Sequence, residues 1–228
     1  MPTSSRSLTS IPRANAALVF ADGQLIFQHL EDGVEYAKIV SGAAASTAFQ
    51  AAGIDSGWLE PGVVRWGVSQ KGSWSVQLIH PERERTLLFE RTTDGDLIPD
   101  HLTLRLPPLV MIGINATYHL WALRDREVHA RTPLYYAPFP NVYGNAHICF
   151  GSNTVAPVEQ DGMRQALNLF CDAPFGQTSI QNKSVRHPQD VRQMLNEVAD
   201  SGGAYPVEDL VPYHTETYLG DMLARLLA

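Results

Sequence analysis

Strand-like segments predominate between residues 17 and 136 of this chain, and amphipathic helical stripes appear only after residue 160. The segment 102–106 alternates apolar and polar residues, which is the two-residue period of a half-buried strand. Val191, Leu195 and Val198 instead recur at the spacing of one helix face. Strands first and helices afterwards indicate an α+β fold.

The strands are expected to form an antiparallel meander. The segments with strand character are 17–20, 24–27, 34–40, 74–80, 85–89, 102–106, 109–114, 118–123 and 128–136. Asp22-Gly23 lies between the first two and predicts a tight hairpin turn. We expect a sheet from about Trp74 to Tyr136, with the C-terminal helices packed on one face.

Three helices are expected in the last third of the chain. The first is short and lies around Met163 to Phe170, and the last is the apolar stripe 218–227. Between them, Pro188 precedes and Gly202 follows the stripe that begins at Val191, as helix start and stop signals.

The composition sets the domain organisation and excludes some functions. Residues 1–15 are poor in apolar residues and are expected to be disordered, 16–60 to form an N-terminal β-rich elaboration, and 61–228 to form the main domain. A net charge of −7 argues against binding driven by nucleic-acid phosphates. The lack of a signal-peptide or membrane-length apolar run predicts a cytoplasmic protein that does not use a membrane.

Only two cysteines occur, Cys149 and Cys171, and they form neither a disulfide framework nor a CxxC pair. No HExxH, GxSxG, phosphate-loop or GxGxxG motif is present, and the eight histidines do not pair at metal-ligand spacing. No metal or cofactor is therefore expected. Cys171 follows an apolar stripe and is interpreted as a packing residue.

The informative segment is 137–151, Ala-Pro-Phe-Pro-Asn-Val-Tyr-Gly-Asn-Ala-His-Ile-Cys-Phe-Gly. Its proline, asparagine and glycine residues predict an irregular surface loop after the last strand. A cysteine at the end of such a loop can be both exposed and held in place. Cys149 is therefore the candidate nucleophile of the chain.

Pro140-Asn141, followed eight residues after the asparagine by Cys149 with Ile148 before it, resembles the His-Pro-Asn…Ile-Cys loop of ubiquitin-conjugating (E2) enzymes. That family also runs from strands through the cysteine loop to helices. Phe139 stands where E2 enzymes usually have histidine, Ala146 where glycine is usual, and Phe150-Gly151 replaces the usual Leu-Asp. The resemblance implies an α+β, UBC-like meander with an active-site loop and C-terminal helices, preceded here by an extra β-rich segment.

More narrowly, the chain resembles prokaryotic E2 family D, the B proteins of PRTRC gene clusters. The segments that carry this resemblance are 106–110, 113–115, 132–135, 137–142 and 148–151, so it covers roughly residues 75–155. It implies an E1-like adenylating enzyme, a ubiquitin-like modifier and a JAB-type metalloprotease as partners, with the modifier carried as a thioester on Cys149.

Chemistry assigns expected roles to three loop residues. Cys149 must reach the thiolate state to form a thioester. The amide of Asn141 could stabilise the oxyanion formed during transfer, or its side chain could only fix the loop by local hydrogen bonds. His147 could favour the thiolate or accept a proton, or be a solvated loop histidine.

Two other interpretations of the cysteine stay open at this stage. In one, the E2-like fold only binds partners, as a scaffold or adaptor without catalysis. In the other, Cys149 is a redox-sensing thiol, which requires Cys171 close enough to resolve it.

Overall fold

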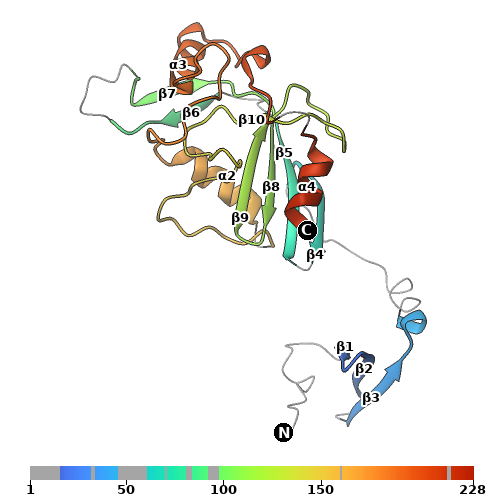
Figure 1. The fold of residues 1–228 in the computed structure, drawn as a ribbon. Helices are drawn as coiled ribbons and strands as arrows, with labels where there is room; N and C mark the ends of the chain where they lie inside the picture. Colours follow the sequence, from blue (N-terminus) through green and yellow to red (C-terminus); the bar gives the residue numbers. More distant parts are fainter. Residues whose placement is uncertain are drawn as a thin grey trace. The chain divides into compact units, whose positions relative to one another are not determined.

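The computed structural model describes residues 16–31, 34–45, 61–69, 71–80, 84–91, 98–159, 161–214 and 217–228. The chain divides into two compact units, Met1–Trp58 and Leu59–Ala228, which are described separately here (Figure 1). The N-terminal segment 1–15, expected to be disordered, lies outside the described residues, as do residues 46–60.

The smaller unit contains a three-stranded antiparallel sheet in the order β1-β2-β3. Its strands are β1 (Ala16–Ala21), β2 (Gln24–Glu31) and β3 (Val34–Val40). Asp22 and Gly23 both have positive φ, 50° and 76°, which is the backbone that a two-residue hairpin turn requires. The hairpin predicted at Asp22-Gly23 is therefore confirmed.

The larger unit is built on a five-stranded antiparallel sheet in the order β10-β9-β8-β5-β4. Its strands are β4 (Val63–Ser69), β5 (Gly72–Ile79), β8 (Leu109–Ile114), β9 (Thr117–Ala122) and β10 (Tyr135–Tyr136). The expected strand 128–136 was too long, because only its last two residues pair with β9. No expectation had been set for β4, which pairs with β5 at one edge.

The meander is interrupted between β5 and β8. There the chain forms a separate two-stranded sheet from β6 (Arg85–Leu88) and β7 (His101–Leu104), and β5 pairs directly with β8. The expectation of one continuous meander is wrong at this point. Sequence periodicity marks each strand but not its partner, because pairing depends on contacts distant in the chain.

Helices follow the sheet, as predicted for an α+β fold. They are α2 (Gly162–Asp172), α3 (Val191–Ser201) and α4 (Leu219–Leu227), with a short 3-10 turn, η2 (Val207–Asp209). Asp190 caps α3 by accepting a hydrogen bond from the Arg192 amide, and Gly202 ends it with a φ of 63°. The stop signal read from Gly202 is thus confirmed.

The sheet is covered on both faces, so the expectation that all helices pack on one face is wrong. Alternate residues of β8 point to opposite sides. Leu109 and Met111 join a core with α2 and α3, while Val110 and Ile112 join a second core with α4. The chain reaches the far face along the β10 edge, where Pro212 pairs with Tyr135 and Tyr218 pairs with Pro133 just before α4.

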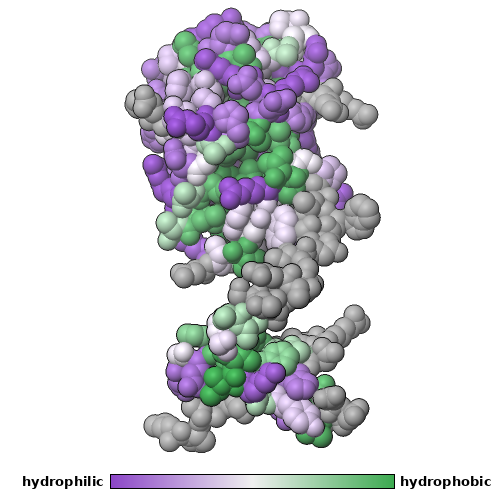
Figure 2. All heavy atoms as spheres, turned by 90° about the vertical axis from the view of Figure 1, so that its right-hand side faces the viewer, coloured by the Kyte–Doolittle hydropathy of each residue, from purple (hydrophilic) through white to green (hydrophobic). Residues whose placement is uncertain are grey.

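One surface of the larger unit carries a row of hydrophobic side chains. Val64, Trp66 and Val68 alternate along the edge strand β4 and are 50%, 40% and 73% exposed. Figure 2 shows hydrophobic residues on the face that carries β4 and α4. Among the described residues, no helix is long and apolar enough to cross a membrane.

Candidate functional site

The Pro-Asn…Cys segment folds as a small hairpin from Asn141 to Cys149. The Cys149 amide donates to the Asn141 carbonyl oxygen at 2.8 Å, and Val142 forms an antiparallel bridge with Ile148. Nearer the tip, the Tyr143 amide donates to the His147 carbonyl oxygen at 2.9 Å. The expected irregular loop therefore has a defined register, in which Asn141 and Cys149 stand directly opposite each other.

The second arm of this hairpin extends the main sheet. The Leu120 amide donates to the Ala146 carbonyl oxygen, and the Ile148 amide to the Tyr118 carbonyl oxygen, both at 2.9 Å. β10 pairs with the later part of β9, so the arm takes the remaining part of the same edge. Cys149 is thus fixed by the sheet rather than by the loop alone.

The two sides of the hairpin differ in their surroundings. Val142 and Ile148 point into the core and are 1% and 0% exposed. Cys149 is half-buried, and Tyr143 is exposed. Opposite residues of an antiparallel pair share a face, so Tyr143 and His147 lie on the outer side together. Their rings stack with centroids 6.1 Å apart and planes 4° apart.

Tyr143 is a neighbour of the cysteine that sequence reasoning missed. A hydrogen bond between its hydroxyl and the Cys149 sulfur raises the pKa of Tyr143. The phenol therefore stays protonated beside the thiol at neutral pH. The signal was available in the register, because pairing Asn141 with Cys149 places Tyr143 diagonally across from the sulfur.

Asn141 is held on several sides. Its φ is 59°, a left-handed conformation that asparagine adopts more readily than most residues. Its side-chain oxygen accepts from the Thr178 hydroxyl at 3.1 Å, and its amide nitrogen donates to the Pro174 carbonyl oxygen at 3.5 Å. An amide nitrogen carries two hydrogens, so one is left for another acceptor.

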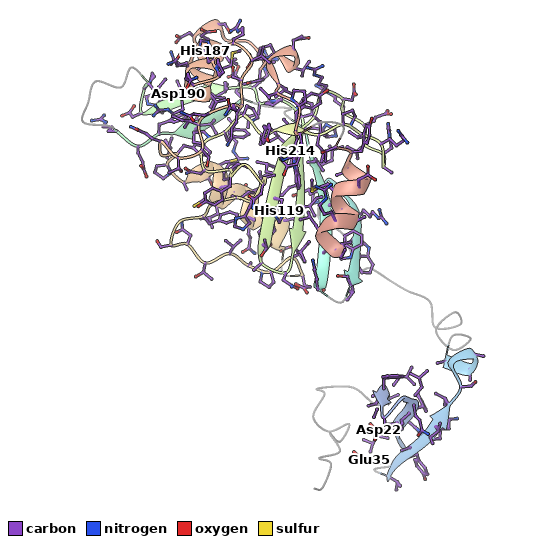
Figure 3. All side chains as sticks on the ribbon, viewed as in Figure 1. Asp22, Glu35, His119, His187, Asp190 and His214 are labelled. Atoms are coloured by element: carbon purple, nitrogen blue, oxygen red, sulfur yellow. The ribbon has the colours of Figure 1, made fainter. Side chains whose placement is uncertain are left out.

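His147 contacts a second, more deeply buried histidine. The rings of His119 and His147 meet edge to face with centroids 5.5 Å apart, and the two residues form a backbone bridge. Figure 3 shows His119 on the sheet. Burial, with a smaller contribution from the charge of His147, lowers the pKa of His119 to about 4. His119 is therefore neutral under the hairpin at physiological pH.

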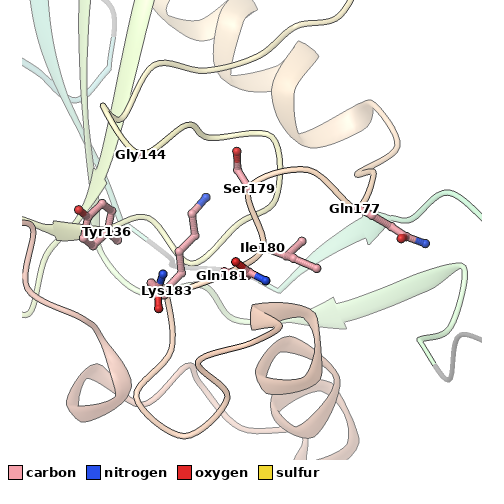
Figure 4. A pocket seen from close by; sticks show the side chains of 8 residues that line it. Tyr136, Gly144, Gln177, Ser179, Ile180, Gln181 and Lys183 are labelled. Carbon is pink, nitrogen blue, oxygen red and sulfur yellow. The ribbon is translucent and has the colours of Figure 1, made fainter.

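A lysine lies beneath the first arm of the hairpin. Lys183 is 3% exposed, and its ammonium donates to the carbonyl oxygens of Phe139, at 2.6 Å, and Val142. Burial lowers the pKa of Lys183 to about 7. It adjoins a pocket of about 340 Å³ between the hairpin tip at Gly144 and the segment 177–183 (Figure 4). The sequence has only three lysines, but no local pattern in it links Lys183 to the loop.

Phe139 and Cys171 both belong to the core. Phe139, which stands in place of the usual histidine, is fully buried, and its ring packs against Phe170 and Phe175. Cys171 is 1% exposed, and burial raises its pKa to about 11. The interpretation of Cys171 as a packing residue is confirmed. It lies inside the last turn of α2 rather than after it.

Ala146 occupies a position where glycine would be unstrained. Its φ is 65°, in the left-handed region, yet its methyl group is buried in the core beside α4. Glycine has no Cβ and would adopt this conformation without strain. The Ala146 methyl group instead adds buried apolar surface at this position.

Among the described residues, no three His, Cys, Asp or Glu side chains gather as they would to hold a metal ion. What the site presents is one half-buried thiol on a sheet-anchored hairpin, with the Tyr143 hydroxyl bonded to it, Asn141 opposite it in the register and His147 two residues before it.

An antiparallel sheet, a cysteine hairpin on its edge and helices after it are consistent with the fold of E2 conjugating proteins. The sequence matches the family model of prokaryotic E2 family D over residues 35–213, and the chain belongs to that family. The match extends well beyond the 75–155 expected from the motifs. Comparisons with curated proteins and with solved structures found no match. Membership places the protein among ubiquitin-like conjugation pathways in general.

Proposed function

We propose that this protein accepts a ubiquitin-like modifier from an E1-like enzyme as a thioester on Cys149 and transfers it to an amine. The observation that carries the proposal is the half-buried Cys149 thiol, fixed by the hairpin bond to Asn141 in a member of an E2 family. A nucleophile must be both accessible and positioned, and Cys149 meets both conditions.

The proposed reaction has two steps, a thioester exchange and an aminolysis. The Cys149 sulfur attacks the carbonyl carbon of the modifier's E1 thioester, the new carbon–sulfur bond forms, and the E1 thiol leaves. An acceptor amine then attacks the same carbon, the carbon–sulfur bond breaks with Cys149 leaving as a thiolate, and an amide forms. The proton lost by the amine finally restores the Cys149 thiol. Both steps pass through a tetrahedral oxyanion.

The neighbours of Cys149 suit these steps. The amide hydrogen of Asn141 that does not bond Pro174 can donate to the oxyanion. His147 can take up the proton released by the amine. The Tyr143 hydroxyl can donate to the sulfur when it leaves as thiolate.

The test is a loading assay with ATP, the E1-like enzyme and the modifier from the same gene neighbourhood, read on a non-reducing gel. The wild type should form an adduct that a thiol reductant removes. Cys149→Ser should form none or a reductant-resistant oxyester, and Cys171→Ser should load normally because that residue is buried. Loss of the adduct in Cys171→Ser alone would reverse the site assignment.

A second candidate is an E2-fold adaptor that binds partners without catalysis. It is favoured by the bonds of Asn141 to Thr178 and Pro174 and by the use of Phe139 for packing, since both give structural roles to positions of the catalytic motif. If cognate partners bind the protein but load neither cysteine, the adaptor function holds. A JAB-type metalloprotease is a further expected partner in either case.

The redox-sensing interpretation receives little support. A resolving thiol must become a thiolate and reach its partner. Cys171 is buried within α2 and has a pKa of about 11, which makes it a poor resolving thiol.

A further inference from the structure

The segment between α2 and α3 makes hydrogen bonds to the first arm of the Cys149 hairpin. The backbone amide of Asn141 donates to the Thr178 carbonyl oxygen at 3.2 Å. Lys183 donates to the carbonyl oxygens of Phe139 and Val142, which flank Pro140-Asn141. Figure 4 shows the Lys183 side chain pointing from its own segment toward the loop that contains Gly144. Thr178 and Lys183, both between α2 and α3, thus fix the first arm of the hairpin. This is the arm whose Asn141 carbonyl oxygen accepts a hydrogen bond from the Cys149 backbone amide.

The segment that carries Lys183 is itself rigidly attached. The Val185 amide donates to the Asp209 carbonyl oxygen at 3.0 Å, and the Asn182 amide donates to the Pro188 carbonyl oxygen at 2.7 Å. Farther along, His187 bonds Glu197 of α3 at 2.7 Å, and Figure 3 shows His187 beside that helix. Lys183 therefore extends from a fixed base.

The two carbonyl groups need the ammonium. Phe139 and Val142 are 0% and 1% exposed, so their carbonyl oxygens have little access to water. A buried carbonyl without a donor carries a desolvation cost that the loop can relieve only by moving. An ammonium has three hydrogens and can serve both oxygens at once.

We propose that Lys183 is a positioning residue for the thioester site, which sets the geometry of Cys149 by fixing the arm that contains Asn141. Lys183 does not touch the reacting atoms. It acts through the Phe139 and Val142 carbonyls, then through the backbone bond from Cys149 to Asn141. This inference concerns the site of the proposed function, but its test does not require that Cys149 carry a modifier.

The charge of Lys183 should change near neutrality, and this gives the proposal a signature. Both of its bonded partners are neutral carbonyls, and burial favours the uncharged amine. The other titratable side chain that lines the pocket is Tyr136, whose pKa is raised by burial and which stays neutral. The hairpin should therefore be held most firmly below about pH 7, where Lys183 is charged.

The experiment measures how fast iodoacetamide alkylates Cys149 between about pH 5.5 and 9, in a Cys171→Ser background where Cys149 is the only thiol. The compared forms are Lys183 itself, Lys183→Met and Lys183→Arg. With Lys183, the profile should show a second inflection near pH 7 besides the titration of the thiol. Both variants should lack it, because methionine is never charged and arginine always is.

Hydrogen exchange gives an independent measurement on the same proteins. In Lys183→Met, amides of 139–149 should exchange at least about tenfold faster, while those of β8 stay protected, because the loosened contacts are local. Lys183→Arg keeps the donors and should restore most of the protection. If Lys183→Met fails to fold, the alkylation profile of Lys183→Arg still tests the proposal, because that variant should lack the inflection near pH 7.

Two results would overturn the proposal. One is a pH profile with the same inflection in all three forms. The other is an exchange increase spread evenly over the larger unit, which would make Lys183 a general contributor to stability. Failure of thioester loading with an unchanged Lys183 signature would instead count against the proposed function alone.

Discussion

Cys149 and Cys171 carry the same thiol in two different parts of the larger unit. Cys149 ends a hairpin on the sheet edge and is half-buried, beside the exposed Tyr143. Cys171 faces the core from α2 and is 1% exposed. The residue type is the same, so the difference in exposure comes from position in the fold, and exposure is one condition for a thiol to react.

The two regions are nevertheless joined by one side chain. Phe139, at the base of the hairpin, packs edge to face on Phe170, the residue before Cys171, with ring centroids 5.7 Å apart. Phe139 therefore links the hairpin that carries Cys149 to the helix that carries Cys171.

The largest expected effect is the difference in alkylation between the two thiols. Cys171 has a pKa of about 11, so at pH 8 only about one in a thousand of these groups is a thiolate, and burial slows it further. Native protein treated with iodoacetamide should be modified at Cys149 at least about a thousandfold faster, measured by peptide mass spectrometry. Denatured protein is the control and should react at both sites. Comparable native rates would remove the basis of the contrast.

The next effect concerns the shared packing. Phe139→Ala should lower the free energy of unfolding by about 3–5 kcal/mol, because it leaves a cavity between Phe170 and Phe175. Urea unfolding measures the change. Tyr143→Ala, on the exposed side of the same hairpin, is the matched control and should cost far less. In Phe139→Ala, Cys171 should also become measurably reactive. A stable variant with inert Cys171 would show that the two regions are independent.

Local patterns in the sequence predicted the elements of the fold well. The turn at Asp22-Gly23, the strand 109–114 and the stripe that became α3 each follow from residues close together in the chain. Local patterns did not predict that β6 and β7 form a separate sheet or that α4 packs on the far face of the main sheet. These depend on which surfaces meet, and periodicity carries no information about the partner.

For the site, the sequence located the loop but not all the residues that contact it. The spacing from Asn141 to Cys149 located the loop, and the structure pairs these two residues across a hairpin. Tyr143 was within reach of the same reasoning once that pairing was assumed. Lys183 and Thr178 were not, because they come from a segment after α2 and meet the loop only in three dimensions.

A smaller effect concerns the sheet beneath the Cys149 hairpin. The folded-state pKa of His119, about 4, lies below its ordinary value of 6.5. Its contribution to stability is present above pH 6.5 and is lost as the pH falls toward 4, because the unfolded chain binds the proton first. Relative to His119→Phe, the native protein should lose about 2 kcal/mol over this range, allowing for partial screening by water. If the unfolding free energies of the native protein and His119→Phe change with pH in parallel, this prediction is wrong.

The smallest effect concerns Tyr143, which distinguishes the surroundings of Cys149 from those of any exposed thiol. Its hydroxyl bonds the Cys149 sulfur, and its ring stacks on His147. A hydroxyl that donates to the attacking sulfur helps to hold it in position for reaction. Tyr143→Phe keeps the stacked ring and removes only the hydroxyl, so alkylation of Cys149 at pH 8 should slow by about two- to fivefold. Tyr143→Ala separates the two contributions, since it also removes the stacking. A faster rate in Tyr143→Phe would mean that the hydroxyl shields the sulfur instead of activating it.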